Sequence, residues 1–310
     1  MVWRVSDIPD LKGRLAIVTG SNSGTGYETA LVLAGRGADV VLAARNAGKA
    51  ADARQQILAA YPGASVRIET LDLASQASVT GLAERLLEAG NPIDILVNNA
   101  GVMALPRRQV SVDGFELQMA TNYFGHFALT ARLLPLLTAG TARVVPVSSI
   151  VHRQGQIRLA DLNHETGYRP WPVYAQSKLA MLMFALELAR RSEAGGWGLT
   201  SVAAHPGYAR TSLIENGPMV ASAVARAGLK HVFRPFIEPM ISHSAASGAL
   251  PILLAATSPD VKPGDYLGPT QLNEMKGPPG PAEIRPHALD VEVAAQLWSA
   301  TERLVGVKFG

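Results

Sequence analysis

This chain of 310 residues contains no cysteine. That absence excludes disulfides, thiolate nucleophiles and cysteine-ligated metal centres. The histidines, including His152, His205 and His243, lack the spacing of metal ligands, so no metal site is predicted. Charge is also scarce: 17% of the residues are charged, the net charge is +3, and no run of Lys or Arg concentrates it. We therefore expect no nucleic-acid partner.

Long apolar runs are missing as well. The longest, residues 179–186, falls far short of the ~20 residues that a membrane-spanning helix needs. Residues 1–7 show no apolar stretch typical of a secretory signal. The sequence therefore predicts a cytoplasmic protein without a membrane span.

What the chain does have is a regular alternation of apolar strand-like runs and helical patterns. Hydrophobic residues make up 48% of it, enough to fill one large core. Strands are expected at 15–19, 38–44, 66–70, 93–97, 143–147, 199–204 and 266–267, and helices at 47–60, from Ser75, at 114–137 and at 173–190. Pro146 predicts a bulge in the fifth strand. The alternation predicts an α/β fold: a single doubly wound parallel sheet of about seven strands with helices on both faces, in one domain over 1–310.

A glycine-rich turn separates the first strand from the helix that follows it. Gly20, Gly24 and Gly26 allow close approach of the backbone to a ligand, and the helix N-terminus offers free N–H groups and a positive dipole. The turn therefore predicts a cradle for the pyrophosphate of a dinucleotide. It consists of Gly20, Ser21, Asn22, Ser23, Gly24, Thr25 and Gly26. A turn that is rich in glycine for structural reasons alone has the same pattern, so support must come from elsewhere in the chain.

Unusual polar residues also follow the other predicted strands. They include Arg45, Asp72, Asn98, the Ser148-Ser149 pair and the segment 205–207. In a doubly wound sheet, ligands bind beyond the carboxyl ends of the strands. These residues therefore predict one ligand site at that edge of the sheet.

Tyr174 and Lys178 lie four residues apart at the start of a predicted helix, which places both side chains on one face. A phenol with a pKa of ~10 is a poor base at neutral pH, but a nearby ammonium stabilises the phenolate. The spacing is typical of a general acid/base pair. A packed tyrosine beside a solvated lysine would have the same spacing.

Together these motifs resemble those of the short-chain dehydrogenase/reductase family. In chain order they are Thr19-Gly20-x-x-x-Gly24-x-Gly26, Asn98-Asn99-Ala100-Gly101, Asn122, Ser149, Tyr174-x-x-x-Lys178 and Pro206-Gly207. The resemblance implies a Rossmann-type fold and a hydride-transferring enzyme. The long interval between Ser149 and Tyr174, with Trp3 and Leu297-Trp298, is similar to the retinol-dehydrogenase-like branch. That branch implies lipophilic alcohols or carbonyl compounds as substrates.

The resemblance also implies roles for four catalytic residues. Tyr174 is expected to exchange a proton with the substrate oxygen, which Ser149, preferred over Ser148, would polarise. Lys178 is expected to lower the pKa of Tyr174 and to bind the nicotinamide ribose. Asn122 is expected to hold a water that links Lys178 to solvent.

The end of the second strand favours NADP(H) over NAD(H). An NAD enzyme places a carboxylate there to bind the ribose 2′-hydroxyl. This chain has Arg45, whose guanidinium can pair with a 2′-phosphate. In the family pattern Asp72 meets the adenine and Asn98 lies beside the ribose. The other cofactor contacts are expected from Asn46, Leu73, Ala100, Gly101, Tyr174, Lys178, Pro206, Gly207 and Thr211.

Two apolar regions carry further expectations. Residues 211–245 predict a substrate lobe, which is either a lid over an apolar ligand or an amphipathic segment packed on the domain or another subunit. The helices at 114–137 and 173–191 are apolar on more than one face, as Met181, Met183, Phe184 and Leu188 show. By family resemblance they predict the interface of a homodimer or homotetramer.

The predicted function is thus an NADP(H)-dependent oxidoreductase acting on a small lipophilic alcohol/carbonyl pair, with Tyr174 as general acid and base. The alternative is a non-catalytic NADP(H)-binding sensor, which usually loses the tyrosine–lysine pair that is intact here. The glycine spacing disfavours an extended-family epimerase. The three residues between Tyr174 and Lys178 disfavour an enoyl reductase, which has six.

Overall fold

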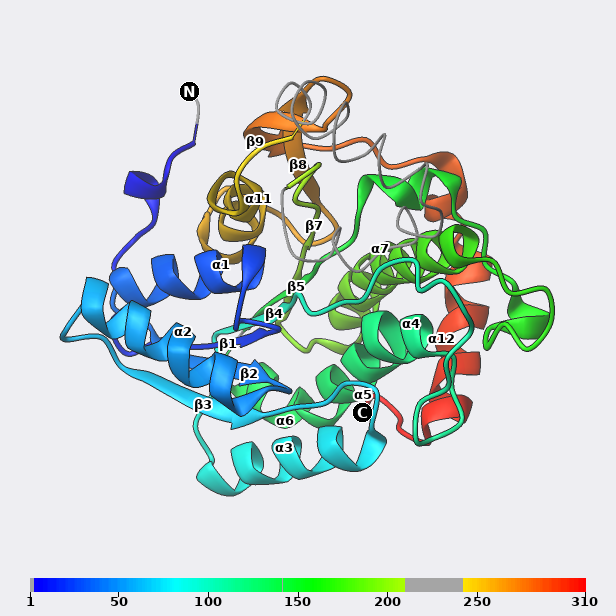
Figure 1. The fold of residues 1–310 in the computed structure, drawn as a ribbon, viewed down its shortest axis with the longest axis horizontal. Helices are drawn as coiled ribbons and strands as arrows, with labels where there is room; N and C mark the ends of the chain where they lie inside the picture. The colour runs from blue at the N-terminus through cyan, green and yellow to red at the C-terminus, as the bar shows by residue number, and fades with distance from the viewer. Residues whose placement is uncertain (1–2, 141, 210–241) are drawn as a thin grey trace.

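The computed structural model describes residues 3–140, 142–209 and 242–310. At its centre lies a six-stranded parallel sheet in the order β3-β2-β1-β4-β5-β6, which is the order of a doubly wound fold (Figure 1). A second sheet, β7-β8-β9, adjoins it through a bridge between Val147 and Ala204. The strands are β1 (Leu15–Thr19), β2 (Asp39–Ala44), β3 (Val66–Thr70), β4 (Ile95–Asn98), β5 (Arg143–Pro146), β6 (Thr200–Ser201), β7 (Ala203–Ala204), β8 (Tyr266–Gln271) and β9 (Lys276–Pro281). The predicted fold class is confirmed; antiparallel β9 is an addition to it.

Helices cover both faces of the sheet (Figure 1). They are α1 (Gly24–Gly35), α2 (Ala47–Ala60), α3 (Gln76–Ala89), α4 (Leu117–Met119), α5 (Gly125–Arg132), α6 (Leu134–Gly140), α7 (Pro170–Gly195), α11 (Ala245–Thr257) and α12 (Val291–Val305). The alternation of side chains along β1 divides the core into two layers. Ile17 belongs to the layer beneath α3, α5 and α7, and Val18 to the layer beneath α1, α2 and α11.

Local capping fixes where two of these helices begin. Asn46 accepts a hydrogen bond from the Lys49 N–H at 2.9 Å and starts α2, while Ser75 accepts one from the Ser78 N–H at 3.3 Å and starts α3. These caps lie immediately after β2 and near the end of β3. They place the helix N-termini at the carboxyl edge of the sheet, where the polar residues were expected.

Pro146 does not produce the predicted bulge; instead it leaves a gap in the hydrogen bonding on one side of β5. The pairing of β5 with β4 runs through it in unbroken register, from Arg143 opposite Ile95 to Pro146 opposite Asn98. On the other side of β5, the ladder bonds Val202 N–H to Val144 O at 3.0 Å and Ser148 N–H to Ala204 O at 2.8 Å. Pro146 lies between these two bonds and has no N–H to donate. The predicted sixth strand is accordingly divided into β6 and β7 at that level.

The long helix predicted over 114–137 is interrupted. It consists of α4, a π-helical turn over Ala120–Phe124, α5 and α6. Asn122, in the π turn, donates to Val102 O and accepts from Val102 N–H, so a contact with a distant loop accompanies the irregular turn. The helical periodicity of the sequence carries no trace of this tertiary contact.

The apolar residues that suggested a subunit interface are buried inside the monomer. Met181, Met183, Phe184 and Leu188 are all at most 2% exposed. The C-terminal helix α12 covers this side of the molecule, with Trp298 packed among aromatic rings of α5 and α7. The apolar character of α7 is therefore explained without a partner, and the oligomeric state stays a prediction.

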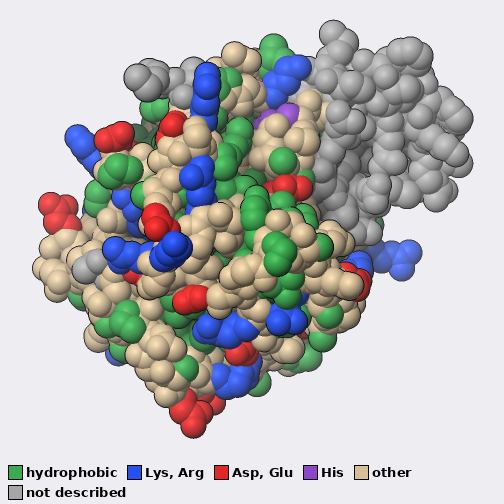
Figure 2. All heavy atoms as spheres, turned by 90° about the vertical axis from the view of Figure 1, so that its left-hand side faces the viewer, with side chains coloured by type: hydrophobic (Ala, Val, Ile, Leu, Met, Phe, Trp, Pro, Cys, Tyr) green, Lys and Arg blue, Asp and Glu red, His purple; other side chains and the backbone are tan. Residues whose placement is uncertain are grey.

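Among the described residues of the face drawn in Figure 2, acidic and basic side chains are interspersed, and Lys and Arg form no continuous patch. No helix within the described residues has the length and apolarity needed to cross a membrane.

Candidate active site

A cavity of about 470 Å³ lies along the carboxyl edge of the parallel sheet. Residues that follow β1, β2, β3, β4, β5 and β7 all contribute to its wall. The structure thus brings together the polar segments that the sequence placed at the strand ends. Of the predicted site residues, those that line the cavity are Gly20, Asn22, Ser23, Gly24, Thr25, Arg45, Asp72, Leu73, Ala100, Gly101, Ser149, Tyr174, Lys178, Pro206 and Gly207.

The glycine turn packs so closely on the loop after β4 that larger residues do not fit. Gly20 adopts a left-handed φ of 65°, and a Cβ on it would lie 2.8 Å from the Cα of Ala100. A Cβ on Gly26 would overlap the side-chain nitrogen of Asn99. Ser21 has a fully buried hydroxyl with no partner among the described residues. An unpaired buried hydroxyl beside free helix N–H groups fits a cradle for an anionic ligand.

Thr19, at the end of β1, ties this turn to the loop after β4. Its hydroxyl oxygen accepts the N–H groups of Asn99 at 2.9 Å and Ala100 at 3.0 Å, and contacts His126 Nε2 at 2.9 Å. The other ring nitrogen of His126 lies 3.0 Å from the carbonyl of Asn122. That carbonyl can only accept, so Nδ1 carries the proton and Nε2 accepts from the Thr19 hydroxyl. Burial lowers the pKa of His126 to about 3, which keeps the ring neutral.

The two predicted asparagines lie outside the described cavity wall. Asn98 is fully buried and donates to the Thr130 hydroxyl at 3.0 Å, so it faces α5 rather than the cavity. Asn122 also stays out of the cavity wall: its side-chain nitrogen donates to Val102 O and to the Ser177 hydroxyl, both at 2.9 Å. Its carbonyl is also bonded to His126, so these contacts attach Asn122 to the loop after β4, and its role in a proton relay stays a prediction.

Tyr174 reaches the cavity from the first turns of α7, together with Ser149 from the segment after β5. Burial raises the pKa of the Tyr174 phenol to about 12, and a hydrogen bond with the Ser149 side chain partly offsets that rise. The expected depression of this pKa by Lys178 is therefore absent from the protein alone. The phenol is protonated at neutral pH, and the serine chosen from the sequence lines the same cavity.

Lys178 shares a helix face with Tyr174, as the spacing predicted. Its ammonium lies 5.9 Å from the centre of the tyrosine ring and donates to the carbonyl of Val147 at 3.0 Å. Burial lowers the pKa of Lys178 to about 8. A single carbonyl partner leaves two ammonium hydrogens for a ligand in the cavity.

Two cationic side chains follow β2, where the sequence analysis predicted one. Arg45 and Lys49 both line the cavity, and Asp72 is the sole acidic residue in the described part of its wall. Lys49 was missed from the sequence, although it lies four residues after Arg45 in a helix that starts there. Asn46 serves as the cap of α2, and the Asp72 side chain accepts the N–H of Ala74 at 3.0 Å. The excess of positive charge fits a dinucleotide with several phosphate groups.

Another part of the cavity wall is apolar. It includes Val102, Met103, Leu105, Ile150, Val151 and Trp171. The ring of Trp171 meets that of Tyr174 edge-on, with 6.1 Å between their centres. Thr211 and residues 211–241 of the predicted lobe lie outside the described residues.

The sequence profile of the short chain dehydrogenase family matches residues 14–218. The chain belongs to the short-chain dehydrogenase family. This short-chain dehydrogenase is 37% identical to Retinol dehydrogenase 13 of Homo sapiens over 300 residues, which cover 96% of this chain and 86% of the relative. It is 37% identical to Polyprenol dehydrogenase of Mus musculus over 315 residues, which cover 99% and 88%. The resemblance drawn from the motifs is thereby confirmed.

Solved structures of the same fold agree. A crystal structure of an uncharacterized protein from Mycobacterium paratuberculosis is 36% identical, covers 100% of both chains and superposes with a TM-score of 0.81. A 3-oxoacyl (acyl-carrier-protein) reductase from Agrobacterium tumefaciens, solved with NADP bound, is 26% identical with a TM-score of 0.62 over 82% of this chain and 91% of its own.

Proposed function

We propose that this short-chain dehydrogenase transfers a hydride between NADP(H) and a lipophilic alcohol/carbonyl pair, with Tyr174 as general acid and base. The observation that carries the proposal is the convergence of Tyr174, Ser149 and Lys178 on the wall of one cavity that also contains the glycine turn. The nicotinamide, when bound, supplies the hydride donor or acceptor. The protein residues then have only to bind, orient and move one proton.

Tyr174 suits the reductive direction at neutral pH. Because burial raises its pKa to about 12, the phenol holds the proton that a carbonyl oxygen needs as it becomes an alcohol. Ser149, in the same cavity wall, can donate to that oxygen as negative charge develops on it. In the oxidative direction the phenolate needs a neighbouring positive charge, which protonated Lys178 can provide.

The charge pattern after β2 supports NADP(H) as the cofactor. Arg45 and Lys49 can both pair with a 2′-phosphate. In the described part of the wall no carboxylate follows β2, where it would bind a 2′-hydroxyl. The family uses both nicotinamide cofactors, so this preference rests on these side chains. The structural relative solved with NADP bound is consistent with it.

The apolar wall supports a lipophilic substrate. Met103, Leu105, Ile150, Val151 and Trp171 line the cavity and offer no charged group to a substrate, and Trp171 contacts the ring of Tyr174. Two relatives that are 37% identical bear names of dehydrogenases of retinol and polyprenol, which are long apolar alcohols. The proposal therefore extends to substrates with an extended hydrocarbon portion.

A homologous series of aldehydes, assayed by NADPH absorbance, tests this proposal. Each additional buried methylene is worth about 0.8 kcal/mol, so kcat/KM should rise about three- to fourfold per carbon until the cavity is filled. Trp171→Ala should flatten the series. A wild-type series that is flat or inverted would contradict a lipophilic substrate, while absence of turnover with every member would contradict the enzyme assignment.

A further inference from the structure

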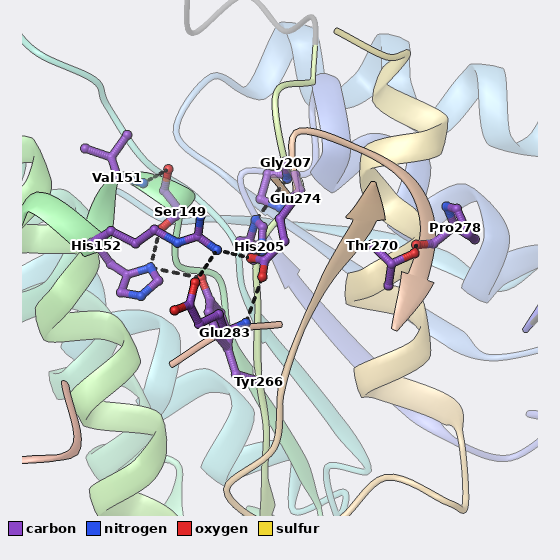
Figure 3. A network of polar contacts seen from close by, with 12 residues as sticks. Ser149, Val151, His152, His205, Gly207, Tyr266, Thr270, Glu274, Pro278 and Glu283 are labelled. Atoms are coloured by element: carbon purple, nitrogen blue, oxygen red, sulfur yellow. Dashed lines mark hydrogen bonds and ion pairs between the residues drawn. The ribbon is translucent and has the colours of Figure 1, made fainter. Parts of the chain in front are cut away.

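A half-buried carboxylate, Glu274, lies at the tip of the β8–β9 hairpin, near Gly207 of the cavity wall (Figure 3). Leu272, Asn273 and Glu274 are three consecutive non-glycine residues with left-handed φ angles of 49°, 52° and 67°. L-residues with a Cβ adopt this conformation rarely, and a strained turn persists only where its surroundings hold it. The contacts of Glu274 show what holds this one.

Both oxygens of Glu274 are engaged. Oε2 lies 2.8 Å from the Arg153 guanidinium and 3.1 Å from His205 Nε2, and Oε1 accepts the N–H of Glu283 at 2.8 Å. The side chains of Glu274 and Arg153 are only 14% and 16% exposed, and that of His205 is fully buried. Screening by water is weak at such a site, so this pair is held more firmly than a surface ion pair.

The contact of Glu274 with His205 leads to the Pro206-Gly207 loop, which lines the cavity (Figure 3). The N–H of Gly207 donates to His205 Nδ1 at 3.2 Å, so Nδ1 accepts and Nε2 carries the proton that it donates to Glu274. A Cβ on Gly268 would overlap the imidazole, which shows how closely the ring is enclosed. Glu274 thus fixes both the tautomer and the orientation of His205 immediately before the loop.

The contact of Glu274 with Arg153 leads to the segment that follows Ser149. Arg153 belongs to the 3₁₀ segment Ile150–Gln154 that follows Ser149 directly. Within this segment His152 Nδ1 lies 2.8 Å from the carbonyl of Ser149, which fixes the start of the segment (Figure 3). One carboxylate therefore joins the Ser149 segment to the Pro206-Gly207 loop, and both segments line the same cavity.

We infer that Glu274 is a positioning residue that holds the Ser149 segment and the Pro206-Gly207 loop in a fixed position relative to each other in the wall of the active cavity. The inference rests on the proposed function, in which Ser149 contacts the substrate oxygen and the loop contacts the cofactor. Loss of Glu274 leaves Arg153 without its better shielded partner and frees the His205 ring to turn. The effect should appear in cofactor binding and turnover of folded enzyme and not only in stability.

The test compares Glu274→Ala, Glu274→Gln and the matched control Glu283→Gln. Glu283 contacts the same guanidinium at 3.4 Å, but it is 49% exposed and its side chain makes no contact with His205 among the described interactions. Each variant is measured well below its unfolding temperature for the Kd of NADPH, for the fluorescence of bound NADPH, and for kcat and KM separately. Misplacement of reacting groups by about 1 Å can cost ~100-fold in rate, so kcat/KM of Glu274→Ala should fall about 10- to 100-fold with a raised Kd for NADPH.

Glu274→Gln keeps an acceptor for His205 but loses the charge that holds Arg153, so its loss should be intermediate. Glu283→Gln should retain wild-type constants. Folded Glu274→Ala with wild-type Kd, fluorescence and kcat would overturn the inference; if Glu274→Ala does not fold, folded Glu274→Gln with wild-type constants would do so. A wild-type protein that neither binds NADPH nor turns over would instead overturn the proposed function, and with it this inference.

Discussion

At the scale of single residues, Arg45 and Lys49 decide the choice of cofactor in this account. They sit on either side of the Asn46 cap at the start of α2, and both line the cavity. Two cations on one small anion form charge-assisted hydrogen bonds, which are roughly twice as strong as neutral ones. A ribose 2′-hydroxyl offers the same cations only a neutral acceptor, so the interaction is weaker. We therefore expect the free energy of cofactor discrimination to be concentrated at one end of β2.

Removal of both cations should therefore erase the preference for NADPH. In Arg45→Ala/Lys49→Ala the Kd of NADPH should rise about 10- to 100-fold, as expected when a charged hydrogen-bond partner worth about 1.5–3 kcal/mol is lost. The Kd of NADH should change little. Lys12→Ala, at an exposed lysine near the opposite end of β1, is the control for net charge. Equal affinities for NADPH and NADH in the wild type, measured by fluorescence titration, would refute the cofactor assignment.

Residues related by local spacing were accessible to sequence reasoning, whereas residues related only by the fold were not. The face shared by Tyr174 and Lys178 follows from helical geometry, and the structure confirms it. His126 meets Thr19 across 107 positions, and His205 meets Glu274 across 69. No pattern in the sequence links those pairs. The partners of Asn98 and Asn122, Thr130 and Val102, were not predictable for the same reason, since the fold supplies them.

At the scale of elements, helix α12 completes the core on the side of α5 and α7. Trp298 is 1% exposed, with its ring centre 4.9 Å from that of Phe127 and 4.4 Å from that of Phe309. Its indole N–H donates to Glu302 at 3.0 Å, so the polar end of the side chain is also satisfied. In the sequence, Leu297-Trp298 supported only the family resemblance. The structure shows that Trp298 fills the core.

Truncation of this tryptophan should therefore destabilise the domain strongly. Trp298→Ala should lower the free energy of unfolding by about 3–5 kcal/mol, the range for loss of a large aromatic side chain from a core. Leu304→Ala, on the same helix but 41% exposed, should cost far less. Urea unfolding followed by circular dichroism measures both variants. Equal losses would show that α12 does not close the core as described.

Element boundaries were predictable where a local signal sets them. Helix α2 spans Ala47–Ala60 and strand β3 spans Val66–Thr70, both as expected, because a cap or a turn bounds each one. The π turn over Ala120–Phe124 and the division of the sixth strand at Val202 were not predictable in this form. Both depend on a neighbour in space: the loop after β4 in the first case and Pro146 in the second.

At the scale of the whole molecule, buried neutral histidines link stability to pH. Burial lowers the pKa of His126 to about 3 and that of His152 to about 4. An unfolded histidine titrates near pH ~6.5, so above that pH both states are neutral and the linkage is absent. Below pH ~6.5 these histidines bind protons in the unfolded chain but not in the native state. The free energy of unfolding should then fall as the pH falls, by up to about 1.4 kcal/mol per pH unit for each such histidine.

Urea unfolding between pH 7.5 and pH 5 should show this loss in the wild type. His126→Gln keeps a polar side chain but cannot titrate, so its stability should depend less steeply on pH, by up to about 1.4 kcal/mol per unit. The starting stability of the variant at pH 7.5 does not matter, because only the slope is compared. Identical slopes in the two proteins would mean that His126 is not held neutral by burial.

The central claim is that Tyr174 exchanges the proton with the substrate, and Tyr174→Phe tests it most directly. The ring still packs beside Trp171 and only the hydroxyl is lost, so the fold and the Kd of NADPH should stay close to wild type. General acid–base groups contribute 10²- to 10⁴-fold, or about 3–5 kcal/mol of barrier, and kcat/KM on the best aldehyde should fall by that factor. Tyr61→Phe, at an exposed tyrosine outside the cavity wall, is the matched control and should be fully active. A Tyr174→Phe enzyme that binds NADPH and keeps most of its activity would contradict the account.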